Sequence, residues 1–230
     1  MRLLTKEQIV TLPNWAEQLA EVTRLAWTGH DGTCYFPYKP LTQSQYWIEV
    51  VLPAWHNDSI HSWAMVEGTQ IIAHAAFVKK NGIWECGRWV ALPQAPKGTM
   101  SCLVTELFHH AQKQKWQFQV ECTQAHTASE KICRRLGLRF AGIGILEKID
   151  NIWWDIIYFD NLPHPDFSPV KGTIGNPLGQ KILVSPFFEE RLKMIHQLIT
   201  TKNGEDLPPK FFHILPELEP TVRQIIALNL

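Results

Sequence analysis

The chain has 230 residues, enough to bury the core of one domain with an appendage. Its 22 basic and 22 acidic residues balance, so the basic surplus typical of nucleic-acid-binding proteins is absent. No segment has the roughly 20 apolar residues that a membrane span needs, and residues 1–18 lack the pattern of a signal peptide. We therefore expect a cytoplasmic protein with neither a nucleic acid nor a membrane as partner.

The five cysteines are odd in number and show no C-x-x-C spacing. Reduced thiols explain such a set better than disulfides or a zinc site. The histidines show no ligand spacing such as H-E-x-x-H, so we expect no metal.

Two helices are predicted near the N-terminus. Asn14 and Glu17 have the spacing of a capping box, and apolar residues recur at helical intervals after them. The segment 30–40 is polar and turn-rich, which is typical of a loop. Thr42 is placed to cap a second helix that kinks or ends near Pro53.

The periodicity then changes to that of antiparallel strands. Short runs rich in Trp, Val, Ile and Ala are separated by dipeptides that favour hairpin turns. The runs cover 62–66, 70–79 and 83–92, and the turns are Glu67-Gly68 and Asn81-Gly82.

A helix, a strand, a helix and two closing strands follow. They are predicted over 99–115, 118–122, 127–136, 138–148 and 152–159. The order ααβββαβαββ predicts an α/β (α+β) fold, in which helices flank a mixed, mostly antiparallel sheet.

We expect this fold to occupy residues 1–160. Residues 161–230 begin with a linker rich in Pro and Gly and continue as a helical C-terminal extension. The extension has three possible roles: packing on the core, closing a substrate cleft, or forming a homodimer contact.

The segment 83–138 contains the most informative pattern. A strand feeds a loop with Lys97-Gly98 that opens an amphipathic helix. Unpaired backbone N–H groups and a helix N-terminus together suit an anion such as a cofactor pyrophosphate. Downstream, Phe118-Gln119-Val120-Glu121-Cys122 precedes a short helix and a Leu-Gly turn.

These parts resemble the acyl-CoA-binding core of the GNAT acyltransferase superfamily. The downstream run matches the family pattern L-x-L-E-V … N-x-x-A-x-x-L-Y-x-x-x-G-F in spacing, with its Glu and Gly retained. Three family residues are replaced, since Asn becomes His126, Ala becomes Ser129 and Tyr becomes Cys133. The pyrophosphate loop is degenerate, because only Gly98 matches the glycine signature. Pro96 also removes one amide donor from this loop.

The resemblance implies acetyl-CoA, or another acyl-CoA, as co-substrate. The residues expected to bind it lie on the strand before the loop, in the loop, and at the start of the short helix: Val90, Ala91, Leu92, Gln94, Lys97, Gly98, Thr99, Met100, His126 and Ser129.

Transfer to an amine needs a proton acceptor, because an amine with a pKa of about 10.4 is protonated at neutral pH. By resemblance, Glu85 is the candidate base and Cys133 takes the place of the Tyr that reprotonates the CoA thiolate. Glu85 as an edge carboxylate and Cys133 as a small buried hydrophobe are the structural alternatives. Glu121 and His74 are weaker candidate bases.

The resemblance thus implies an N-acetyltransferase that acts on a primary amine of a small molecule or peptide by direct attack. Two alternatives remain open. The stretch Trp84-Glu85-Cys86-Gly87-Arg88-Trp89-Val90 resembles the W-E-x-S-R-F-x-V strand of acyl-homoserine-lactone synthases, which take acyl groups from acyl-carrier protein. The degenerate loop and the missing Tyr favour a non-catalytic module that binds acyl-CoA or a partner.

Overall fold

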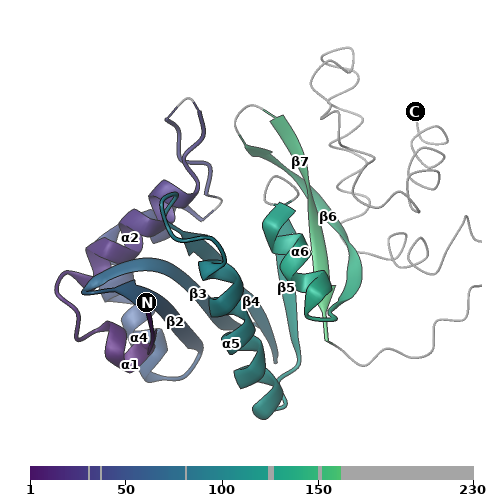
Figure 1. Ribbon diagram of the computed structural model, residues 1–230. Coiled ribbons are helices and arrows are strands. Elements are labelled where there is room, and N and C mark those ends of the chain that lie inside the picture. The colour runs from purple at the N-terminus through teal and green to yellow at the C-terminus, as the bar shows by residue number, and fades with distance from the viewer. Residues whose placement is uncertain (31, 37, 81, 124–126, 150–151, 162–230) are drawn as a thin grey trace, which may run out of the picture. The chain divides into compact units, whose positions relative to one another are not determined.

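The structure is a computed structural model that describes residues 1–30, 32–36, 38–80, 82–123, 127–149 and 152–161 (Figure 1). The chain forms two compact units, Met1–Gln119 and Val120–Leu230. In the described part, no helix has the length and apolar character needed to cross a bilayer. The predicted extension 161–230 lies outside the described residues, apart from its first residue.

The predicted order of elements is confirmed, with an additional strand and a short helix before it. The first unit contains β1 (Arg2–Thr5), α1 (Lys6–Ile9), α2 (Trp15–Ala26), the 3-10 helix η1 (Lys39–Thr42), α3 (Ser44–Tyr46), the π-helix η2 (Trp47–Val51), α4 (Leu52–His56), β2 (Ile60–Glu67), β3 (Gln70–Lys80), β4 (Ile83–Ala91) and α5 (Thr99–Lys113). Then follow β5 (Phe118–Thr123), which starts in the first unit and ends in the second, α6 (Thr127–Arg135), β6 (Arg139–Ile149) and β7 (Ile152–Asp160).

Strands β1 to β4 pair antiparallel in sequence order. Along one row of cross-strand partners, Leu4 lies opposite Ala64, Ala64 opposite His74, and His74 opposite Val90. Because directly opposed residues share a face of the sheet, this register places His74 and Val90 on one face and their neighbours in sequence on the other.

The face that carries His74 packs against the N-terminal helices. Trp47, Val51 and Trp55 recur every four residues, are buried, and join the same apolar cluster as Leu19 of α2 and Ala64 of β2. Amphipathic helix α5 contacts β2, β3 and β4, and Figure 1 shows it on the other side of the sheet from α4.

The face under α5 is filled by aromatic side chains. Phe77 of β3 lies 5.3 Å from Phe118 between ring centroids, and Trp84 stacks on Trp116 at 4.2 Å. Trp89 lies 6.1 Å from Phe108 of α5. Core packing therefore accounts for these tryptophans without a ligand.

The second predicted helix is instead a series of short helical turns. The Leu52 N–H donates to the Trp47 carbonyl five residues earlier, which makes η2 a π-turn. Pro53 explains the break, because its ring clashes with the carbonyl four residues before it and it has no N–H to donate. The wider turn moves that carbonyl away.

The predicted cap of the first helix is wrong in its geometry. Asn14 precedes α2, but it adopts a left-handed conformation (φ 50°) and its side chain makes no capping hydrogen bond. The capping contact occurs earlier, where the Thr5 N–H donates to Gln8 Oε1 at 3.0 Å at the start of α1.

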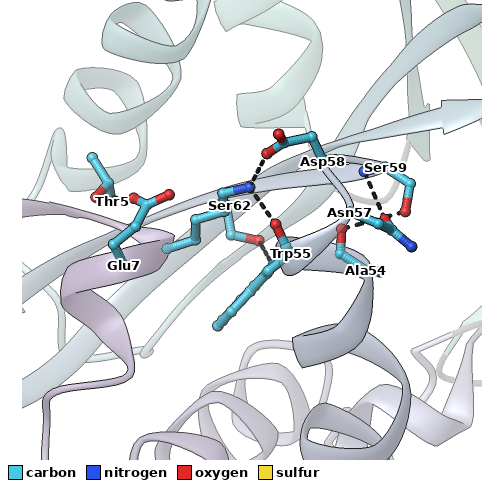
Figure 2. Close-up of polar contacts among 9 residues, drawn as sticks. Thr5, Glu7, Ala54, Trp55, Asn57, Asp58, Ser59 and Ser62 are labelled. Carbon is cyan, nitrogen blue, oxygen red and sulfur yellow. Dashed lines mark hydrogen bonds and ion pairs between the residues drawn. The ribbon is translucent and has the colours of Figure 1, made fainter.

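Polar contacts fix the turn between α4 and β2 (Figure 2). The Ser59 N–H donates to Asn57 Oδ1 at 3.0 Å, and Trp55 Nε1 donates to Ser62 Oγ at 2.9 Å. Lys6 Nζ donates to the Trp55 carbonyl and forms an ion pair with Asp58. The beginning of α1 is thereby tied to the end of α4.

In the second unit, β6 and β7 form an antiparallel hairpin in which Phe140 lies opposite Phe159. Helix α6 ends at Arg135, and Gly137 (φ 73°) follows in a left-handed turn, in which the Leu138 N–H donates to the Cys133 carbonyl at 3.1 Å. The Tyr158 hydroxyl donates to Glu121 Oε2 at 3.2 Å.

The buried bond between Trp55 and Ser62 gives a test of this packing. Ser62→Ala is expected to lower the free energy of unfolding by about 1–3 kcal/mol, because it leaves the indole N–H buried without an acceptor. Urea denaturation of Ser62→Ala, Trp55→Phe and the double variant measures the coupling. The double variant should lose less than the sum of the single losses, and strict additivity would contradict the bond.

Candidate active site

Strand β4 contains a β-bulge in its second half. His74 lies opposite Val90 and Ala76 opposite Gly87, so Arg88 and Trp89 together face the single residue Ala75. Arg88 has φ 56°, a left-handed conformation that is uncommon for a non-glycine residue. The bulge keeps Glu85, Gly87 and Val90 on the face of the sheet that carries His74.

A polar cluster occupies this face, between β3, β4 and the segment 38–47. We define it as His74, Arg88, Tyr38, Tyr46 and Trp47. The indole of Trp47 meets the imidazole of His74 edge-on, with ring centroids 5.1 Å apart. The hydroxyls of Tyr38 and Tyr46 lie 3.0 Å apart, and their rings are also edge-on, at 5.6 Å.

Burial controls the ionisation of this cluster. The pKa of His74 is lowered to about 3, first because the side chain is fully buried and second because the Arg88 guanidinium lies near it. Burial also lowers the pKa of Arg88, against the attraction of Tyr46, Glu85 and Tyr38. The pKa of Tyr46 is raised by burial and by its hydrogen bond with Tyr38, which keeps the hydroxyl protonated.

His74 is a poor general base in this setting. A base with a pKa of about 3 gains little from accepting a proton at neutral pH. Neither ring nitrogen makes a hydrogen bond of acceptable geometry, although the main chain of Arg88 lies near the ring.

Glu85, the predicted base, lies on β4 on the same face as this cluster. Its Oε2 is 2.7 Å from Lys80 Nζ, and its side chain is 24% exposed. Such a partly exposed pair is worth at most about 1 kcal/mol. The role of Glu85 stays a prediction.

The predicted pyrophosphate loop joins β4 to α5. Gly98 precedes the helix with φ 90°, in the left-handed region that favours glycine. The loop residues Gln94, Pro96, Lys97 and Gly98 are exposed, whereas Val90 and Leu92 are buried below them.

Hydrogen bonds inside the turn decide which loop groups remain for a ligand. The Ala95 N–H donates to the Leu92 carbonyl at 2.9 Å, and both donors of Thr99 bond the Pro96 carbonyl. Within the described part of the chain, no hydrogen bond occupies the amides of Lys97, Gly98 and Met100. These three amides at the start of a 15-residue helix are the groups best placed to bind an anion.

The remaining predicted residues belong to the second unit. Cys133 of α6 is fully buried, and its Sγ lies 3.7 Å from Cys122 Sγ. This burial agrees with the alternative in which Cys133 is a small hydrophobic residue of the core. Ser129 is half-buried on the same helix, and His126 lies outside the described residues.

The cluster around Arg88 was not predicted as a site. Arg88 lies in the stretch that resembles a strand of acyl-homoserine-lactone synthases, but nothing in the sequence connects it with Tyr38 and Tyr46, which lie more than 40 residues earlier. The described residues contain no group of three side chains suited to hold a metal.

No family model matches the sequence, and no curated protein matches it. Solved structures are similar in fold. A ribosomal-protein-alanine N-acetyltransferase from Brucella melitensis matches with TM-score 0.55 and 13% identity over 71% of this chain and 100% of its own. A GNAT-family protein from Desulfovibrio desulfuricans matches with TM-score 0.52 and 14% identity over 69% and 98%. A ribosomal-protein-S5-alanine acetyltransferase from Vibrio fischeri matches with TM-score 0.53 and 14% identity over 74% and 97%.

Burial of His74 predicts a loss of stability in acid. Its folded pKa of about 3 lies below the ordinary 6.5, so the unfolded state binds more protons and stability falls as pH drops from 6.5 towards 3. His74 should contribute about 2 kcal/mol to the loss between pH 7 and pH 5.

Urea denaturation of wild type and His74→Leu at both pH values measures this contribution. Leucine has a similar volume and cannot be protonated, so the variant should lose about 2 kcal/mol less than wild type. His109→Gln, on the exposed side of α5, is the control and should behave like wild type. Equal losses in wild type and His74→Leu would exclude the contribution.

Proposed function

We propose that this chain, which has the fold of the GNAT N-acetyltransferases, is an acyl-CoA-dependent N-acyltransferase. In its simplest form the reaction moves an acetyl group from acetyl-CoA to the primary amine of a small molecule or peptide. The resemblance of the segment 83–138 to the acyl-CoA-binding core is independent support for the same function.

The observation that carries this proposal is the turn between β4 and α5. Gly98 holds a left-handed conformation, and the amides of Lys97, Gly98 and Met100 have no hydrogen-bond partner among the described residues. Amides at a helix N-terminus attract phosphate oxygens, and the exposed Lys97 adds a positive charge. We assign the pyrophosphate of acyl-CoA to these groups.

The pantetheine arm is assigned to Val90, Ala91 and Leu92, the residues that lead into this loop. Gln94 is exposed at the start of the loop. Thr99 is assigned to the site as the first residue of α5, since both of its donors already bond the Pro96 carbonyl. His126 and Ser129 remain expected cofactor contacts on the evidence of the resemblance.

The chemistry requires one proton acceptor and one proton donor. The amine nitrogen attacks the thioester carbonyl carbon, Glu85 accepts the amine proton directly or through water, and the C–S bond then breaks. A backbone N–H at the bulged strand is suited to stabilise the oxyanion. The departing thiolate takes a proton from water. Cys133 as the donor rests on the resemblance alone, because its side chain is fully buried.

Substitution of Gly98 tests the pyrophosphate site. Gly98→Asn and Gly98→Asp have nearly the same shape and both tolerate a positive φ, so they differ mainly in charge. Space around a Cβ at this position is open, so neither should clash. Isothermal titration with acetyl-CoA should give a Kd at least about tenfold weaker for Gly98→Asp than for Gly98→Asn.

Gly82→Asp is the matched control, because Gly82 also has a positive φ (84°) and open space. It should bind acetyl-CoA like wild type. If wild type binds neither acetyl-CoA nor longer acyl-CoAs, the proposal fails and a carrier-protein donor or a non-catalytic role becomes the better hypothesis.

A second test separates a catalytic Glu85 from a merely structural one. Glu85→Gln and Lys80→Gln both break the same ion pair, but only the first removes a carboxylate. In a steady-state assay with an accepted amine, Glu85→Gln should lower kcat by about 100-fold or more, while Lys80→Gln retains activity. Similar effects of the two variants would show that the pair serves only structure.

A further inference from the structure

Arg88 is a half-buried cation that lacks a close partner. Its Nη1 atom is buried and has no hydrogen-bond partner. Among the described residues, no ion pair joins Arg88 to a carboxylate. Glu85 is near enough to attract it, but the Glu85 carboxylate is bonded to Lys80 at 2.7 Å.

An arrangement of this kind is unfavourable for the protein alone. A buried charge is costly unless an opposite charge or hydrogen bonds compensate it, and arginine does not lose its proton. Arg88 also has φ 56°, a conformation that asparagine or glycine adopts more readily. The bulge accounts for this backbone conformation, so the buried, unpaired Nη1 is the feature that a ligand would satisfy.

The surroundings identify the chemistry of that ligand. The planar guanidinium matches the two oxygens of a carboxylate. Tyr38 and Tyr46 add a further donor, because when one hydroxyl donates to the other across 3.0 Å, the proton of the second is left for a ligand. Tyr38 is 48% exposed and Tyr46 is half-buried, so the two tyrosines form the solvent-facing side of the cluster that contains Arg88.

We propose that Arg88, with the Tyr38–Tyr46 hydroxyl pair, binds the carboxylate of the acceptor, which is therefore an amine of the amino-acid class. This assignment rests on the proposed acyl transfer. The acceptor is favoured over the acyl donor because both tyrosines belong to the segment 38–46, whereas the donor's phosphates are assigned to the loop at 97–100. Arg88 is in this view the residue that selects the acceptor.

Binding without acyl-CoA tests this proposal separately from the acyl transfer itself. Wild-type protein is titrated with each of the common L-amino acids and, for each one that binds, with its carboxamide, which keeps the amine but lacks the negative charge. We expect at least one amino acid to bind and its carboxamide to bind about tenfold more weakly or worse. If no amino acid binds while acetyl-CoA does, the carboxylate assignment is overturned and acyl transfer stands.

Variants then locate the contact. Arg88→Asn should weaken binding of the amino acid by at least about tenfold, and Tyr38→Phe by a smaller factor. Arg24→Asn removes an exposed arginine of α2 and should change nothing. The melting temperature of Arg88→Asn should equal or exceed that of wild type, because asparagine tolerates the backbone and removes a buried charge. A structural arginine would instead lower it.

Arg88→Lys is the second variant, since it keeps the charge but loses the planar fork. Intermediate binding is expected, and unchanged binding in both Arg88 variants would overturn the assignment. Titration with succinyl-CoA and acetyl-CoA covers the other source of a carboxylate. If Arg88→Asn weakens succinyl-CoA binding but not amino-acid binding, the carboxylate belongs to the donor and the acceptor assignment is wrong.

Discussion

The arrangement of the site depends on one extra residue in β4. If Ala75 faced one partner instead of Arg88 and Trp89 together, every residue after Gly87 would point to the opposite face. Val90 would then leave the apolar cluster that it shares with Trp47. The bulge thus lets one strand present Glu85 and Arg88 to the helical segment 38–47 and still continue into a loop whose amides remain available.

The same arrangement places His74 of β3 in an unfavourable environment. His74 is enclosed between Arg88 and Trp47, where its ring nitrogens lack good hydrogen bonds and its charge is suppressed. A neutral imidazole next to a buried guanidinium avoids repulsion that a second cation would cause. The left-handed backbone of Arg88, its buried Nη1 and the uncharged ring of His74 therefore occur together at the bulge.

Much of the fold could be predicted from the sequence, because alternation and helical spacing are local signals. The hairpins at Gly68 and Gly82 and the stop of α6 before Gly137 were predicted from residues that favour positive φ. β1 was missed because its four residues show no alternation, and only pairing with β2 makes them a strand. The loop was predicted as an anion site from its Lys-Gly turn before a helix and the candidate base by resemblance, whereas the cluster around Arg88 required the register of β3 and β4.

The loop between β4 and α5 shows that a sequence signature does not reveal which hydrogen-bond donors are available to a ligand. The glycines of the family pattern are mostly absent, yet one glycine with φ 90° leaves three amides without partners in the described part of the chain. Conversely Thr99, which looks like a good phosphate ligand, is occupied by the Pro96 carbonyl. Donor availability follows from the hydrogen bonds of the turn, and these are not visible in the residue types.

The π-turn at Trp47–Val51 connects the helix break with the polar cluster. Pro53 disfavours a regular helix at this point, because it has no N–H to donate and its ring clashes with an earlier carbonyl. The Trp47 carbonyl accepts the bond that closes the wider turn, and the Trp47 indole meets His74 edge-on. One break in the helix thus helps to set the direction from which Trp47 approaches the sheet.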